Sequence, residues 1–290
     1  MDKVAIMGLG LMGGSLGLAL KSVGFQGTLA GYARRAETRS VALEAGMIDT
    51  AHDDPVSAVQ DADLVVYCTP ILTIPDLVAA SRQGLKPGAL LTDVGSTKKE
   101  LAQLVTDALA GTAATFVGSH PVAGSEQQGV EAARADLYEG ALVVVTPEQA
   151  DAEPTAVAAV VEFWQQIGAR VRVIDAATHD ALMARTSHLP HLIASLLAVT
   201  VGREDAAAEV GPYCGTGFRD TSRVADGSPD VWHDIVCSNA PAIGEELKQY
   251  RAQLDQLIAW TDARDFDRIK GYLAAGRAAR RALLNTQSME

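Results

Sequence analysis

The chain has 290 residues, which is enough for one large domain or two of ordinary size. Hydrophobic residues make up 48% and charged residues 21%, a composition typical of a soluble globular protein with a sizeable core. The net charge of −12 argues against a general nucleic-acid binder, because neutralising phosphates requires clustered Lys and Arg. Small anionic ligands need only a local cationic pocket, so they are not excluded.

Cysteine usage and the N-terminus point to a reducing compartment. Cys68, Cys214 and Cys237 are scattered and form no CxxC pair, so neither a disulfide framework nor a zinc site is indicated. The N-terminus enters a strand-like run directly and lacks the pattern of a signal peptide. No run reaches the roughly 18 apolar residues of a membrane span. We therefore expect a cytoplasmic protein that does not contact a membrane.

A glycine-rich turn follows the first predicted strand, Lys3–Met7, and precedes a helical run over residues 15–23. It reads Gly8-Leu9-Gly10-Leu11-Met12-Gly13, the GxGxxG spacing. The first glycine permits a tight turn, the second lets a pyrophosphate approach, and the third lets helix and strand pack closely. The helix N-terminus favours an anion. The sequence therefore predicts dinucleotide binding by Gly8, Gly10, Leu11, Met12 and Gly13.

Further strand and helix signals alternate along the next hundred residues. Strands are expected over Thr28–Tyr32 and residues 63–68, 89–94 and 115–117, and helices over residues 37–45 and from a capping box at Thr97 and Glu100 to residue 110. This alternation implies a parallel sheet with right-handed crossovers, whose ligands bind beyond the carboxyl ends of the strands. Thr69 with Pro70, Ser96 and His120 all follow strand ends, so we expect them to line one cleft. Ser96 could instead be a helix cap.

The turn after the second strand bears on the cofactor. NAD-specific folds place Asp or Glu about 20 residues past the glycine turn, where it binds the ribose 2′-hydroxyl. That position falls at Ala33, and Arg34 and Arg35 follow, where an NADP enzyme places a cation for the 2′-phosphate. We predict that NADP is preferred and NAD is usable. The alternative is that the two arginines are surface charge.

The segment Gly118-Ser119-His120-Pro121-Val122-Ala123-Gly124 is the candidate centre of the chemistry. Histidine has an unperturbed pKa near neutrality and is the usual proton handler. Pro121 fixes one dihedral angle, and Gly118 and Gly124 permit tight turns, so we expect a turn that aims the ring of His120 into the cleft. The alternative is an ordinary turn with a surface histidine.

Two more strands are expected at residues 141–146 and 170–174, with a helix over residues 155–167 between them, and then the strand signal ends. Helical patterns cover residues 177–201, 231–238, 243–260 and 266–284. The predicted fold class is α/β: a Rossmann-type dinucleotide-binding domain, residues 1–175, followed by an all-helical domain, residues 176–290. Such a second domain commonly completes the active site or forms a subunit interface.

Two features of the helical half could carry chemistry. His179, His188 and His191 suggest a metal at first sight, but their spacing matches no zinc motif, so no metal site is predicted; they could be hydrogen-bonded core histidines. The segment from Gly215 to Arg223 is predicted to be a glycine-rich loop whose arginines could grip a carboxylate through their planar fork. The alternative is a solvated loop.

Together these segments resemble the prephenate/arogenate dehydrogenase family, also called cyclohexadienyl dehydrogenases. The resemblance covers nearly the whole chain, and its histidine and arginine segments are more specific than its glycine motif. The matching segments are Gly8-Leu9-Gly10-Leu11-Met12-Gly13, Cys68-Thr69-Pro70, Asp93-Val94-Gly95-Ser96-Thr97-Lys98, Gly118-Ser119-His120-Pro121-Val122-Ala123-Gly124, Ser187-His188-Leu189-Pro190-His191 and Gly217-Phe218-Arg219-Asp220-Thr221-Ser222-Arg223.

The resemblance implies the oxidative decarboxylation of prephenate to 4-hydroxyphenylpyruvate, in tyrosine biosynthesis, with hydride transfer to NADP. It implies that His120 receives the 4-hydroxyl proton and that Ser96 helps to set the histidine and the nicotinamide. It also implies a homodimer built through the helical half, with Asp220 and Arg223 near the interface. The residues implied in substrate binding are His191, Arg223, Glu126, His188 and Asp220.

Other functions remain open at this stage. An arogenate dehydrogenase would form tyrosine directly, and Glu126 could favour its substrate's amine, whereas His191 favours prephenate. A β-hydroxyacid dehydrogenase also begins with a GLGxMG turn, but its family uses a catalytic lysine on a helix of the second part, and residues 177–201 contain no lysine. A dinucleotide sensor without chemistry would not need His120, Ser96 and Arg223 together.

Overall fold

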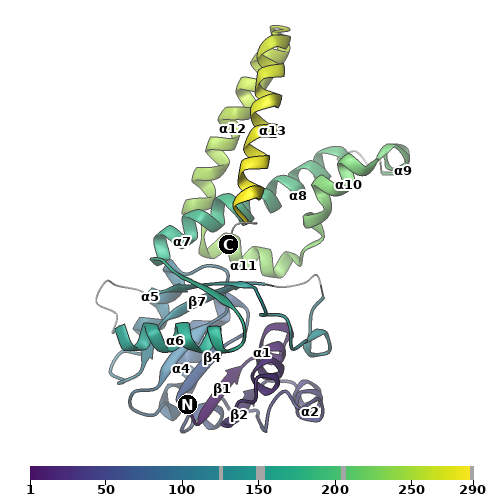
Figure 1. Ribbon diagram of the computed structural model, residues 1–290. Helices are drawn as coiled ribbons and strands as arrows, with labels where there is room; N and C mark the ends of the chain where they lie inside the picture. The colour runs from purple at the N-terminus through teal and green to yellow at the C-terminus, as the bar shows by residue number, and fades with distance from the viewer. Residues whose placement is uncertain (124–126, 148–153, 204–206, 288–290) are drawn as a thin grey trace. The chain divides into compact units, whose positions relative to one another are not determined.

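Six parallel strands form the central sheet of the computed structural model, which describes residues 1–123, 127–147, 154–203 and 207–287 (Figure 1). The sheet has the order β3-β2-β1-β4-β5-β6. The order reverses between β1 and β4, and sheets of this kind bind ligands in the crevice at that switch point. The strands are β1 (Lys3–Met7), β2 (Thr28–Tyr32), β3 (Thr50–His52), β4 (Leu64–Tyr67), β5 (Leu90–Asp93) and β6 (Thr115–Phe116).

Helices cover both faces of this sheet, and its central strands β1 and β4 are accordingly almost wholly apolar. Along β1, Val4 and Ile6 join one buried cluster, and Ala5 and Met7 join another. The first cluster contains Leu16 of α1 and also α6, and the second contains α4 and α5. The helices up to this point are α1 (Leu11–Ser22), α2 (Ala36–Glu44), α3 (Pro55–Val59), α4 (Ile74–Ser81), α5 (Lys99–Ala108) and α6 (Pro154–Gln166). The predicted Rossmann-type arrangement is confirmed.

A second, smaller sheet contains β7 (Gly118–Val122), β8 (Leu142–Thr146) and β9 (Arg170–Val173). The chain passes into this sheet directly from the first one. The N–H of Val117 still donates to the carbonyl of Leu91 in β5 (2.9 Å), and β7 begins at the next residue. β7 pairs antiparallel to β8, with His120 opposite Val144. The predicted turn at His120 is therefore wrong. Pro121 is tolerated because β7 is an edge strand, and a Cβ on Gly118 would lie 2.7 Å from Thr146 Oγ1.

From residue 176 onward the described residues form helices joined by short connections, but the long helix expected over residues 177–201 is not uniform. α7 (Ala176–Met183) passes through a π-helical turn, Ala184–His188, into α8 (Leu189–Val201). Pro190 has no N–H for the carbonyl four residues earlier, which favours a wider turn at this point. α10 (Thr216–Ser222) occupies the segment predicted as a glycine-rich loop, so that prediction is wrong. The remaining helical elements of this region are α9 (Ala207–Val210) and α11 (Pro229–Ser238). Short 3₁₀ turns lie at Ile71–Thr73, Arg82–Gly84, Val130–Ala132, Gly211–Tyr213 and Arg223–Asp226.

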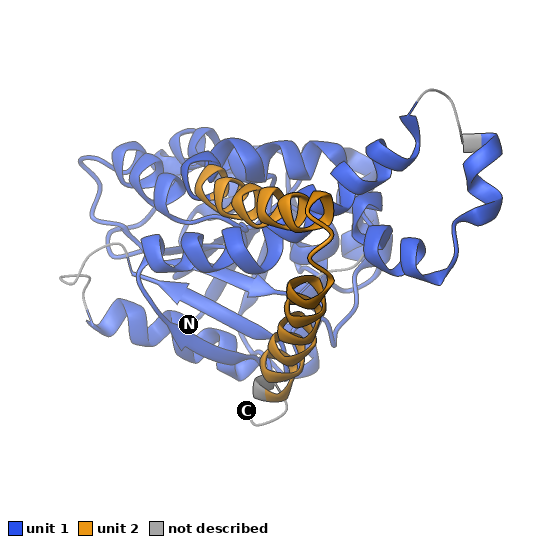
Figure 2. Cartoon of the chain, turned by 90° about the horizontal axis from the view of Figure 1, so that it is seen from above, with its two compact units in different colours: residues 1–242 blue, residues 243–290 orange. Residues whose placement is uncertain are grey.

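The chain divides into two compact units, Met1–Ala242 and Ile243–Glu290 (Figure 2). The second unit is a helical hairpin made of α12, which spans Ala240–Asp262 and begins in the first unit, and α13 (Phe266–Gln287). The rings of Trp260 and Tyr272 meet edge to face, with centroids 5.9 Å apart. The predicted domain boundary at residues 175/176 stays a prediction. In the described part of the chain, no helix combines the length and apolarity needed to cross a membrane.

Candidate active site

The glycine turn lies at the switch point of the sheet, where β1 and β4 end side by side. Gly8 has φ +115°, and a Cβ there would lie 2.9 Å from the carbonyl carbon of Cys68. A Cβ on Gly13 would lie 1.9 Å from the Gly8 carbonyl oxygen, so only glycine fits at both positions. A Cβ on Gly10 would meet nothing within 4 Å. Protein atoms therefore fill the space beside Gly8 and Gly13. The space beside Gly10 is empty, so a ligand can approach the backbone there.

Two further features suit an anion at this turn. α1 begins at Leu11 with Gly10 as its N-cap, and no side chain caps its first-turn N–H groups. These N–H groups carry the positive end of the helix dipole, which favours phosphate. Beside Gly8, the hydroxyl of Thr69 is buried and has no hydrogen-bond partner in the described part of the chain. These residues, with Pro70, Leu11 and Met12 next to them, fit a dinucleotide pyrophosphate.

The turn after β2 carries the residues predicted to choose between the two dinucleotides. Ala33 is buried, whereas Arg34 and Arg35 are exposed. Sequence reasoning missed Arg39 of α2, whose guanidinium donates to the carbonyls of Ala33 (2.7 Å) and Arg34 (3.0 Å). Arg39 therefore holds the backbone of the turn, while the neighbouring arginine side chains point to solvent. The role of Arg34 and Arg35 in cofactor choice stays a prediction.

His120 is the first member of a chain of three buried polar side chains. Its Nδ1 lies 2.9 Å from Nε2 of His179, and the two rings meet edge to face. Nδ1 of His179 lies 2.8 Å from Oδ1 of Asp180. His120 is 8% exposed, His179 0% and Asp180 4%. The strand β7 and the helix α7 thus connect a carboxylate, an imidazole and a second imidazole through two successive hydrogen bonds.

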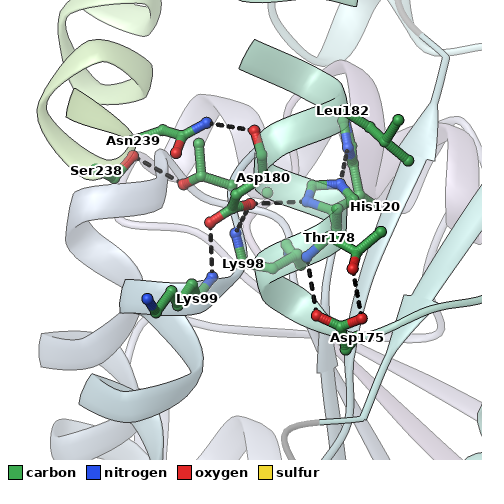
Figure 3. Close-up of polar contacts among 12 residues, drawn as sticks. Lys98, Lys99, His120, Asp175, Thr178, Asp180, Leu182, Ser238 and Asn239 are labelled. Atoms are coloured by element: carbon green, nitrogen blue, oxygen red, sulfur yellow. Dashed lines mark hydrogen bonds and ion pairs between the residues drawn. The ribbon is translucent and has the colours of Figure 1, made fainter. Parts of the chain in front are cut away.

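Asp180 also caps α5, which corrects the capping box predicted at Thr97. The Lys98 N–H donates to Oδ1 of Asp180 (2.8 Å), and the Lys99 N–H donates to Oδ2 (2.9 Å), as Figure 3 shows. The Thr97 hydroxyl instead donates to Ser238 Oγ (2.8 Å). Asp180 therefore supplies, from α7, the cap that the first N–H groups of α5 need.

Burial and charge make His120 a neutral imidazole. Burial is the larger cause and lowers its pKa well below the usual value, and the positive charge that His179, Lys98 and His188 can carry lowers it further. A neutral ring can accept a proton at neutral pH, whereas an imidazolium cannot. His120 is therefore competent as a base or as a strong hydrogen-bond acceptor.

A buried ion pair joins the connection that contains Ser96 to the strand that carries His120. Lys98 Nζ contacts Asp93 Oδ2 and donates to the Ser119 carbonyl (2.8 Å). The Asp93 carboxylate also accepts from the N–H groups of Gly95 (2.7 Å) and Ser119 (3.1 Å). Burial lowers the pKa of the Lys98 ammonium, and the charge of Asp93 acts in the opposite direction. Ser96 itself is half-buried between these anchored neighbours.

The histidines of α8 and of the turn before it connect to the same network. The side-chain amide of Asn239 donates to the Asp180 carbonyl (2.9 Å) and lies 3.2 Å from His188 Nδ1. His188 meets the edge of Trp232, and His191 stacks on that indole with centroids 3.5 Å apart. Burial lowers the pKa of His188 to about 4 and also lowers that of His191.

The residues predicted to bind substrate are only partly brought together. His188 and His191 are buried beside Trp232, whereas Asp220 on α10 and Arg223 at the following 3₁₀ turn are exposed. Both of these segments pack against α8, which carries His191. Glu126 and Gly124 lie outside the described residues.

Two pockets adjoin this network. One, of about 340 Å³, is lined by His191, Trp232 and Gly227 among others. A Cβ on Gly227 would lie 2.6 Å from the Trp232 indole nitrogen, so glycine is needed there. The other, of about 700 Å³, is lined by α5, α7 and the end of α11, including Asp180 and Asn239. Within the described residues, no group of three or more His, Cys, Asp or Glu side chains is arranged to hold a metal ion.

Sequence reasoning missed Asp180, Asn239 and Trp232. Asp180 follows a histidine directly, but an acid next to a histidine on a helix carries no signal by itself. Apart from its neighbour His179, the partners of Asp180 come from the start of α5 and the end of α11, and no local pattern connects those segments with α7. Trp232 could have been suspected as a large aromatic residue near the glycine and arginine segments.

Comparison with known proteins gives a consistent result. The nucleotide-binding domain of prephenate dehydrogenase matches residues 16–173, and the dimerization domain of prephenate dehydrogenase matches residues 175–275. A cyclohexadienyl dehydrogenase of Zymomonas mobilis is 34% identical over 282 residues, covering 97% of this chain and 95% of that protein. A crystal structure of prephenate dehydrogenase from A. aeolicus, in complex with hydroxyphenyl propionate and NAD+, superimposes with a TM-score of 0.90 at 29% identity and covers 98% of both chains. Synechocystis arogenate dehydrogenase superimposes with a TM-score of 0.83 at 30% identity, covering 96% of this chain and 98% of that one.

Proposed function

This chain belongs to the prephenate dehydrogenase family and is a dehydrogenase with a nicotinamide dinucleotide cofactor, and we propose that it oxidatively decarboxylates prephenate to 4-hydroxyphenylpyruvate in tyrosine biosynthesis. The observation that carries the proposal is the buried His120, hydrogen-bonded to His179, which in turn contacts Asp180. The reaction needs a group that takes the 4-hydroxyl proton as hydride leaves C4, the carbon that bears this hydroxyl. Aromatisation with loss of CO2 then drives the reaction forward.

We assign His120 as the acceptor of that proton and Ser96 as the residue that orients the hydroxyl and the nicotinamide. The nicotinamide supplies the hydride acceptor when it is bound. Gly8, Gly10 and Gly13 give its pyrophosphate access to the N-terminus of α1. Residues 1–175 are proposed as the cofactor-binding domain. Residues 176–290 are proposed as the domain that binds the substrate and the second subunit of a homodimer.

We assign the recognition of the two substrate carboxylates to His191 and Arg223. Arginine offers a bidentate fork for a carboxylate, and His191 is held rigid by its stacking on Trp232. His188 and Asp220 are proposed to complete this side of the pocket, and Glu126 is proposed as a substrate-binding residue that could favour the amine of arogenate. Arogenate, which carries an amine on that side chain, is the alternative substrate, and the name of the Synechocystis relative supports testing it.

We propose that NADP is preferred over NAD. The buried Ala33 replaces the acid that would bind a ribose 2′-hydroxyl and would repel a 2′-phosphate. Arg34 and Arg35 are exposed beside it and can donate charge-assisted hydrogen bonds to phosphate oxygens. The A. aeolicus relative was crystallised with NAD+, so the preference of this chain needs its own measurement.

We also propose a homodimer formed through the helical half. In the second unit, Leu247, Tyr250, Leu254 and Ile258 are 37–50% exposed in the single chain. Their spacing of three or four residues places them on one face of α12, as expected for a surface that packs against another helix. Light scattering at micromolar concentration should give the mass of a dimer.

The function is tested by offering the purified protein prephenate and arogenate, each with NADP and with NAD, and following the reduced cofactor by its absorbance. The expected result is the highest kcat/KM with prephenate and NADP. A tenfold higher kcat/KM for arogenate would reassign the substrate, and a higher kcat/KM with NAD would mean that the arginines after β2 are surface charge. His120→Asn should lower kcat by about 10²-fold or more, and near-normal kcat would remove the role assigned to His120.

A further inference from the structure

The neutral imidazole of His120 exists in two tautomers, and only one of them can serve as a base toward the substrate. With the proton on Nδ1, the lone pair lies on Nε2; with the proton on Nε2, the lone pair lies on Nδ1. Nδ1 is the nitrogen that contacts His179. The tautomer of His120 is therefore decided by which way the hydrogen bond to His179 runs.

Asp180 fixes the direction of that bond from the far side of His179. Both oxygens of its carboxylate already accept hydrogen bonds, Oδ1 from the Lys98 N–H and Oδ2 from the Lys99 N–H. A carboxylate only accepts, so the contact to His179 Nδ1 requires an N–H on that nitrogen. In the tautomer of His179 that donates from Nδ1, Nε2 carries a lone pair. That lone pair can only accept, and it accepts from His120 Nδ1.

We propose that His179 and Asp180 are positioning residues that hold His120 in the tautomer protonated on Nδ1, so that the lone pair on Nε2 receives the hydroxyl proton of the substrate. This inference rests on the function proposed above. The hydroxyl O–H bond breaks, an Nε2–H bond forms, and the resulting positive charge is spread toward the Asp180 carboxylate through two hydrogen bonds. Neither residue touches the reacting atoms.

The N-terminus of α5 contributes to the same orientation by holding the carboxylate of Asp180. Because Lys98 N and Lys99 N occupy both oxygens of Asp180, the carboxylate cannot rotate to present another edge to His179 (Figure 3). The same short segment anchors Asp93 and the connection that contains Ser96 through the Lys98 side chain. One stretch of backbone therefore sets both the orientation of the proposed base and the position of the proposed serine.

The tautomer can be read directly by ¹⁵N NMR of the histidine rings in the full-length protein without substrate. The expected wild-type spectrum has His120 protonated on Nδ1 and unprotonated on Nε2. A proton on Nε2 of His120 at neutral pH would overturn the proposal. This readout does not depend on which substrate is used, so it stands even if neither prephenate nor arogenate is turned over.

Two pairs of variants connect the tautomer to activity. His179→Gln keeps an amide oxygen where Nε2 of His179 lay and should retain the His120 tautomer and most of kcat. His179→Phe offers no acceptor; it should lower kcat by about 10²-fold, the range for losing a general base, with KM changed less than about threefold. Equal kcat values for the two variants would contradict the proposal.

Asp175 provides the matched control for Asp180, five residues away on the same helix. Asp175 caps α7 by accepting from the N–H (2.8 Å) and hydroxyl (2.6 Å) of Thr178, and these contacts include no histidine. Asp180→Ala and Asp175→Ala each remove one helix cap, which has a similar cost for the two helices. Only Asp180→Ala should change the tautomer of His179 and lower kcat. If both variants lower kcat equally, Asp180 acts through helix stability alone and the proposal fails.

Discussion

Replacing Lys98 with methionine should destabilise the protein strongly, because it leaves a buried carboxylate without its cation. Lys98 is 1% exposed and Asp93 is 0% exposed. Breaking a buried pair by removing one partner costs about 3–5 kcal/mol, since the remaining charge stays out of water. Asp93 keeps its hydrogen bonds from Gly95 and Ser119, so we expect a loss of about 3 kcal/mol, the low end of that range. For a unit of this size, Tm should fall by about 6–12 °C.

Lys86 supplies a matched control at the protein surface. Its ammonium pairs with Asp63, which also accepts from two backbone N–H groups, those of Asp2 and Lys3. The side chains of this pair are 36% and 28% exposed, so Lys86→Met should cost only about 0–1 kcal/mol. Tm would be measured by calorimetry for both variants. Equal losses of Tm would refute the argument from burial.

Activity and a double variant complete this test. Lys98 Nζ holds the carbonyl of Ser119, the residue before His120, so Lys98→Met should also lower kcat by tenfold or more, of the order expected when a proposed base is displaced from its productive position. Lys86→Met should leave kcat unchanged. Adding Asp93→Asn to Lys98→Met removes the unpaired charge and should recover part of the lost stability. A double variant that loses the sum of the two single effects would show that the charges do not interact.

Three other changes have defined outcomes. Arg223→Ala should raise KM for prephenate by about 10-fold or more, as expected for losing a charge-assisted pair worth about 1.5–3 kcal/mol. Arg223→Lys should recover only part of the lost affinity. An unchanged KM in both variants would mean that Arg223 does not bind the substrate. Ala33→Asp combined with Arg34→Ala should shift the ratio of kcat/KM values toward NAD, measured with both cofactors. The pKa of His188 is lowered from 6.5 to about 4 by burial, so the unfolded chain binds its proton first as pH falls. His188 therefore contributes stability above pH 6.5 that is lost between pH 6.5 and about 4, up to about 3 kcal/mol, and His188→Asn should flatten Tm against pH in that window.

The fold was predictable from the sequence wherever a local pattern decides the structure. The bounds of β1 and β2 agree with the predicted strands, and the strands predicted around residues 63–68 and 89–94 are confirmed as β4 and β5. β3 has only three residues, too few for a periodic signal, and was missed. Gly118 and Pro121 are common turn residues, so the sequence predicts a turn where β7 lies. In the structure Gly118 instead allows close packing against Thr146, and Pro121 occupies an edge strand.

The candidate site was predictable in its members but not in its connections. His120, His188 and His191 were recognised as histidines in unusual segments, and the structure joins them through Asp180, Asn239 and Trp232. These contacts are long-range: Asn239 meets Asp180 and His188 at separations of 59 and 51 residues, and Asp180 meets Lys98 at a separation of 82. A capping box involves residues three positions apart, so the sequence favours Thr97 as the cap of α5. The cap in the structure is Asp180, which is 81 residues from Lys99. Long-range hydrogen bonds of this kind leave no trace in local sequence.

The cap that α5 receives from Asp180 has a consequence for the order in which the protein assembles. An N-cap from the preceding residue forms together with its helix, but this one forms only after a long loop has closed, and closing it carries an entropic cost. The first turn of α5 therefore stays frayed until α7 docks. The amide protons of Lys98 and Lys99 should exchange with deuterium only when α7 detaches, so their protection measures that single opening. The same carboxylate orients His179. The docking of α7 that completes α5 therefore also fixes the geometry of His120 and His179.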